Sequence, residues 1–116
     1  MGNNIVEEKS FDFAVRIVQL FRHLKAKDEY VLSNQILRSG TSIGANISEA
    51  QKAQTRADFN AKMNIALKEA YETDYWLRLL HKTAYLTDNE YQSINNDIRE
   101  IVAILTSICR KTNTNN

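Results

Sequence analysis

The chain has 116 residues, a formal net charge of +1 and no proline, with 43% hydrophobic and 25% charged residues. This length suits a single domain, residues 1–116, that buries its own core, and the lack of proline favours long uninterrupted helices. A near-neutral charge gives no strong overall attraction to nucleic acid. The longest apolar run, residues 101–105, is too short to cross a membrane, and the start lacks a secretory leader pattern. We therefore expect a cytoplasmic protein of the all-α class.

Hydrophobic periodicity predicts four amphipathic helices, and no alternating stretch is long enough for a sheet. The predicted helices cover about residues 10–26, 29–53, 56–82 and 88–110. Because the connections between them are short, neighbouring helices should run antiparallel, as an up-down-up-down four-helix bundle. The polar tail, residues 112–116, is expected to be frayed.

Polar residues at the predicted helix starts support these boundaries. Ser10 is the expected N-cap of the first helix, and Glu29 places a negative charge at the positive end of the second. Thr55 opens the third with a weak capping-box pattern, and Thr87 with Glu90 forms a stronger one for the fourth.

Gly40 and Gly44 lie one turn apart on one side of the second predicted helix. Residues this small let another backbone come close. Apolar residues in the same segment favour a partner within the same bundle over a neighbouring copy; they are Ile36, Ile43 and Ile47. We expect the small-residue faces of the second and third helices to pack closely.

The third predicted helix carries aromatic residues beside its core stripe. Tyr71, Tyr75 and Arg78 share one face, next to Trp76. Aromatic residues of this kind are enriched at subunit interfaces, but they also wrap the edges of monomeric bundles. Both interpretations stay open, and this face is the candidate interface.

Metal and thiol chemistry find little support in the sequence. Neither His23 nor His81 has a carboxylate three residues before it, as a di-iron bundle would require. Both histidines lie among basic residues, where solvent exposure or pairing with a helix dipole is the simpler interpretation. Cys109 falls within an apolar pattern and is expected to be a small buried hydrophobe. No metal and no cofactor are predicted.

The carboxylates Glu49, Glu69 and Glu72 could be brought together by adjacent helices. Without a nucleophile, metal or phosphate loop, however, they specify no reaction. Structural ion pairs are the simpler role, and the basic partners considered for them are Arg38, Arg56 and Lys68. The sequence therefore predicts no enzyme, no catalytic residue and no small-molecule substrate.

The first predicted helix carries a basic edge. Residues 15–27 contain no acid and hold the candidate phosphate contacts Arg16, Arg22, Lys25 and Lys27. Such an edge could contact RNA phosphates, although a solvated helix face is the commonest meaning of such charges.

Residues 35–39, 41–49 and 65–77, with Arg56 and Phe59, resemble a four-helix-bundle family. Its members include proteins encoded in intervening sequences of bacterial large-subunit ribosomal RNA genes, often labelled ribosomal proteins. The accessory variability protein of diversity-generating retroelements looks like a relative. That resemblance implies a homo-oligomer, a ring of five bundles that binds RNA and a reverse transcriptase.

The polar positions of the family signature are matched, residue by residue, by Arg38, Ser42, Asn46, Glu49, Glu69 and Glu72. The chain departs from the commonest pattern with Ala50 where a glycine often follows, and it is near neutral where the retroelement protein is strongly basic. The leading hypothesis is a non-enzymatic, homo-oligomeric assembly module. An RNA-binding accessory protein using the basic edge comes second, and an enzyme using the signature carboxylates ranks far behind.

Overall fold

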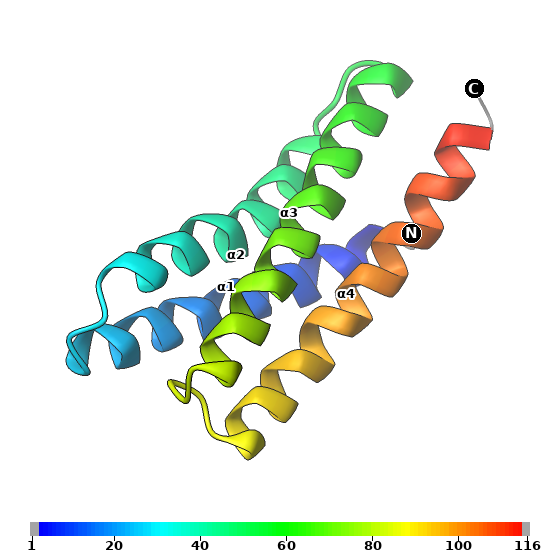
Figure 1. The fold of residues 1–116 in the computed structure, drawn as a ribbon. Helices are drawn as coiled ribbons and strands as arrows, with labels where there is room; N and C mark the ends of the chain where they lie inside the picture. Colours follow the sequence, from blue (N-terminus) through cyan, green and yellow to red (C-terminus); the bar gives the residue numbers. More distant parts are fainter. Residues whose placement is uncertain (1–2, 115–116) are drawn as a thin grey trace.

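The computed structural model describes residues 3–114 as four helices: α1 (Asn3–Ala26), α2 (Val31–Ala50), α3 (Arg56–Lys82) and α4 (Asp88–Thr114). This part of the chain contains no strand, so the all-α prediction is confirmed. Consecutive helices run antiparallel (Figure 1), and each contacts two neighbours: α1 packs on α2, α2 on α3, α3 on α4, and α4 closes on α1. This is the predicted up-down-up-down four-helix bundle. Within the described residues, no helix is both long and apolar enough to span a membrane.

The first and last helices are longer than predicted. α1 begins at Asn3 because the apolar stripe continues to Val6, which is fully buried. Ser10 therefore lies inside α1, where its hydroxyl donates to the Glu7 carbonyl at 3.0 Å, and the expectation that it caps the helix was wrong. At the other end, the predicted frayed tail is helical through Thr114, and residues 115–116 lie outside the described chain.

The second helix is shorter than predicted at both ends. The carboxylate of Glu29 accepts hydrogen bonds from the amides of Leu32 at 3.0 Å and Ser33 at 2.7 Å, so the helix begins just after it. This confirms that Glu29 sits at the positive end of the helix dipole. At the far end, the amides of Lys52 and Ala53 bond carbonyls three residues back, which tightens the chain into turns beyond Ala50.

Threonine caps open the third and fourth helices as predicted. The Thr55 hydroxyl accepts from the Asp58 amide at 3.0 Å. Thr87 and Glu90 form both halves of a capping box: the Glu90 carboxylate accepts from the Thr87 amide at 2.8 Å, and the Thr87 hydroxyl accepts from the Glu90 amide at 3.1 Å.

All four helices contribute to one hydrophobic core. Its large, fully buried side chains include Phe13 of α1, Ile43 of α2, Leu77 of α3 and Leu105 of α4. A buried hydrogen bond also crosses from α2 to α3, between the Ser39 and Thr73 hydroxyls at 3.0 Å. The close contact predicted between the small-residue faces of these helices is therefore partly polar.

Gly40 and Gly44 face α1 and not α3. A Cβ atom built on Gly40 would lie 2.7 Å from Cγ1 of Ile17, and one on Gly44 would lie 3.2 Å from the backbone carbonyl oxygen of Ser10. The expected partner within the same bundle is thus present, but it is the first helix. The glycines allow the backbones of α1 and α2 to approach more closely than any side chain would permit.

Replacing Gly40 by alanine should therefore destabilise the fold. Alanine would gain about 1 kcal/mol in helix propensity, but the new methyl group would overlap the branched side chain of Ile17, and such overpacking costs about 1–3 kcal/mol. We expect a lower free energy of unfolding in urea for Gly40→Ala and no loss for Ser48→Ala, on the exposed side of α2.

An Ile17→Ala background separates this steric effect from a general intolerance of the site. Truncation of Ile17 removes the atoms that the new methyl group would meet, so Gly40→Ala should cost less there than in the natural chain. An equal cost in both backgrounds would contradict the proposed contact.

Candidate functional site

Signature residues from α2 and α3 form a polar seam between these helices. The Arg38 guanidinium lies between two carboxylates of α3: it bonds Glu72, and its Nη1 lies 3.3 Å from Oε1 of Glu69. The Trp76 indole donates to Oε2 of Glu72 at 3.0 Å. Arg38 is thus the predicted ion-pair partner of these acids.

The other signature residues extend the seam along α2 without joining this cluster. Ser42 and Asn46 donate back to their own helix, to the carbonyls of Arg38 at 2.6 Å and Ser42 at 2.8 Å. Glu49 pairs with Lys62 of α3 at 3.0 Å. The bond to Glu49 and its charge raise the pKa of Lys62. Sequence reasoning missed Lys62, because which α3 lysine faces Glu49 depends on how the two helices are rotated.

The seam has the chemistry of a structural contact. Its carboxylates are held by basic or indole groups, and Glu49 is engaged separately from Glu69 and Glu72. Within residues 3–114, no group of three or more histidine, cysteine or acidic side chains could hold a metal ion. Cys109 is buried, and desolvation raises the pKa of its thiol, which disfavours the reactive thiolate.

The predicted interface residues divide between the seam and an exposed face. Tyr71 and Tyr75 are 55% and 51% exposed on the outer side of α3. Arg78 lies 5.9 Å from the centre of the Tyr75 ring and also pairs with Asp74. Trp76 meets Tyr75 edge-on at 5.1 Å but is turned toward Glu72. We call Tyr71, Tyr75 and Arg78 the aromatic face.

The four residues of the predicted basic edge of α1 fall into two pairs, one bonded to other parts of the bundle and one exposed without such a bond within residues 3–114. Arg16 is engaged with α4: its guanidinium bonds Asp97 at 2.6 Å and the Ser93 hydroxyl at 3.0 Å. Lys27 reaches the Tyr85 carbonyl at 3.4 Å. Arg22 and Lys25 are exposed, with the Lys25 ammonium 5.2 Å from the centre of the Phe21 ring.

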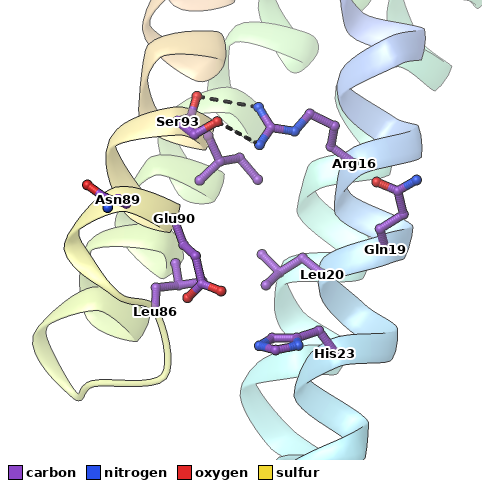
Figure 2. Close-up of a pocket in the computed structure, with 9 residues that line it drawn as sticks. Arg16, Gln19, Leu20, His23, Leu86, Asn89, Glu90 and Ser93 are labelled. Atoms are coloured by element: carbon purple, nitrogen blue, oxygen red, sulfur yellow. Dashed lines mark hydrogen bonds between the residues drawn. The ribbon is translucent and has the colours of Figure 1, made fainter.

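A groove of about 430 Å³ lies between α1 and α4. Figure 2 shows Arg16 reaching across it to Ser93 on α4, and below this bridge His23 and Glu90 face each other from the two helices. Glu90 has a pKa below its ordinary value, chiefly because its carboxylate accepts the Thr87 backbone hydrogen bond and also because His23 and Lys27 are near. Sequence reasoning did not identify this groove, since its walls come from two segments far apart in the chain, residues 16–23 and 86–94.

The contact between Arg38 and Glu72 can be measured by a double-mutant cycle with Arg38→Gln and Glu72→Gln. Glutamine at position 72 keeps an acceptor for the Trp76 indole, so the cycle isolates the charge interaction. We expect a coupling of about 0.5–1 kcal/mol that weakens at high salt. The pair of Lys62 with the more exposed Glu49 serves as the comparison and should couple less. A zero coupling for Arg38 with Glu72 at low salt would contradict the contact.

Comparison with known proteins gives a consistent result. A family model described as 23S rRNA-intervening sequence protein matches residues 2–107. A crystal structure of a protein of unknown function from the S23 ribosomal protein family of Bacteroides thetaiotaomicron VPI-5482 is 59% identical. The similarity covers 95% of this chain and 99% of that one, with a TM-score of 0.92. Comparison with curated proteins gave no match. The chain therefore belongs to the 23S rRNA-intervening sequence protein family.

Proposed function

We propose that the protein is a non-enzymatic helical-bundle module that works as a homo-oligomer. The observation that carries this proposal is the aromatic face of α3, where two tyrosines are about half exposed although the bundle core is already filled. Exposed aromatic side chains flanked by arginine have the composition of protein interfaces. The signature carboxylates support a structural role instead of catalysis, because each is paired across the α2–α3 seam.

A second apolar patch supports more than one contact per copy. Phe11 and Val15 of α1 are 68% and 44% exposed. α1 and α3 are diagonal helices, each flanked by α2 and α4, so the patch and the aromatic face lie on different sides. Two unlike surfaces allow head-to-tail contacts, which close into rings when the rotation permits. The ring of five implied by the family resemblance is one such assembly.

The assembly is tested by measuring the mass of the purified protein at micromolar concentration. We expect a multiple of the monomer mass, and a smaller mass for the double variant Tyr71→Ser/Tyr75→Ser because both aromatic rings of the face are lost. Tyr30→Ser is the matched control, since Tyr30 is similarly exposed, at 52%, but lies at the start of α2. A strictly monomeric natural protein would overturn the proposal.

RNA is the second candidate partner, and the geometry at one end of the bundle favours it. The turn after α1 and the turn after α3 meet there, joined by the contact of Lys27 with the Tyr85 carbonyl. Arg22 and Lys25 are exposed near this end. Of the acids at this end, Glu29 and Glu90 are engaged by backbone amides. The exposed Asp28 and Asp88 accept from the Tyr30 hydroxyl and pair with His81, respectively. Exposed cations at this end could contact phosphates despite the near-neutral net charge.

This site is tested by reversing charge in the double variant Arg22→Glu/Lys25→Glu and titrating structured RNA at several salt concentrations. If both residues contact phosphates, affinity should fall and the salt slope should decrease by about 2. The control is Lys52→Glu/Arg56→Glu, which makes the same charge change at the opposite end of the bundle. Equal affinities for the two double variants would refute the site.

A further inference from the structure

The groove between α1 and α4 combines an apolar floor with polar walls. Leu20, Leu86 and Ile94 form the floor and are 5–8% exposed. Its volume of about 430 Å³ lies within the range of small-molecule sites, about 300–1,000 Å³. Arg16 bridges the two helices at one end, through Ser93 and Asp97. This bridge connects the two walls at that end of the groove.

The walls carry polar groups that the fold leaves available. Within residues 3–114, the side-chain amides of Gln19 and Asn89 make no hydrogen bond to another residue, although both line the groove. Glu90 uses Oε1 for the capping box, which leaves Oε2 for another donor. An amide on each helix and a carboxylate on one offer both donors and acceptors above an apolar surface.

Charge is arranged asymmetrically around this carboxylate. The backbone hydrogen bond from Thr87 lowers the pKa of Glu90, with smaller contributions from the charges of His23 and Lys27, so the carboxylate is ionised at neutral pH. The Lys27 ammonium is positioned by the Tyr85 carbonyl at 3.4 Å. A ligand that places N–H donors at Glu90 and negative charge toward His23 and Lys27 would complement both the carboxylate and the basic residues.

We propose that this groove binds the guanine base of a nucleotide. Guanine presents two adjacent N–H donors on its Watson–Crick edge, whereas adenine, cytosine and uracil do not. Oε2 of Glu90 can accept from one of these donors, and Oε1, which already accepts from the Thr87 amide, has a second lone pair for the other. The flat base would lie on the apolar floor, as bases do when they are read outside a helix. Gln19 and Asn89 are the groups for its remaining edge atoms, and His23 with Lys27 are the groups for its phosphate.

The site does not require the proposed assembly, and it differs from the phosphate contacts at Arg22 and Lys25. Its lining residues come from α1, α4 and the turn before α4, and Lys27 comes from the turn after α1, all within one chain. Failure of oligomerisation, measured as mass on the same samples, would therefore leave this inference standing. A free nucleotide and an unpaired guanosine in RNA present the same chemistry, and the test distinguishes them.

The test is a titration of the full chain with guanosine monophosphate, followed by amide nuclear magnetic resonance. We expect saturable shifts at Leu20, Leu86 and Ile94, with affinities about tenfold or more weaker for the adenosine and cytidine monophosphates. Glu90→Gln should weaken guanosine monophosphate binding by a similar factor, because the amide offers one acceptor in place of a carboxylate. Glutamine also serves in a capping box, so this variant is expected to stay folded.

The matched control is Glu8→Gln, because Glu8 is an exposed carboxylate on α1 outside the groove. This variant should leave binding unchanged. Absence of shifts in the groove, equal shifts with inorganic phosphate alone, or unchanged binding by Glu90→Gln would overturn the proposal.

A hairpin RNA with one unpaired guanosine completes the test. Tighter binding of this hairpin than of the free nucleotide, lost when adenosine replaces the guanosine, would identify RNA as the source. Equal affinities would identify the free nucleotide.

Discussion

The close approach of α1 to α2 is the constraint on which the rest of the bundle depends. Gly40 meets the side chain of Ile17, and Gly44 meets the backbone of Ser10. Because the contact is made partly by backbone, it fixes the separation of the two helices more tightly than flexible side chains could. Ser10 is buried in this contact, inside a helix that begins at Asn3, and so does not act as an N-cap.

The opposite pair of neighbours, α1 and α4, packs less closely. It is the smallest of the four helix contacts, and ion pairs take the place of small residues along it. Arg16 with Asp97, and Lys9 with Glu100, connect the two helices near the surface. Partly exposed pairs of this kind contribute little to stability. The groove of Figure 2 lies along the same boundary.

Several signature polar residues make contacts within the bundle, between α2 and α3. Arg38, Glu69, Glu72 and Trp76 form a connected group in which the indole and guanidinium share one carboxylate. At the observed rotation of α3 against α2, the Arg38 guanidinium reaches both carboxylates of α3. The same rotation turns Tyr71 and Tyr75 outward. The polar seam and the exposed aromatic face therefore go with one and the same orientation of α3.

The sequence by itself determined the four helices, their order and most of their caps. These features depend on local chemistry: Glu29 bonds amides a few residues away, and Thr87 and Glu90 bond each other. Apolar periodicity likewise selected the core side of each helix, including Ile43 and Leu77. The pairing of Arg38 with carboxylates of α3 could also be predicted from the sequence, because opposite charges on neighbouring helices attract each other.

Tertiary structure alone decided how the helices are rotated and which of them meet. It placed the glycines against α1 and not α3, paired Glu49 with Lys62, and withdrew Arg16 from the basic edge into a contact with α4. It also formed the α1–α4 groove from residues far apart in the chain. Periodicity defines the buried side of a helix, but several rotations bury nearly the same apolar area. The choice among them is made by close steric contacts between helices, which no single segment of the sequence contains.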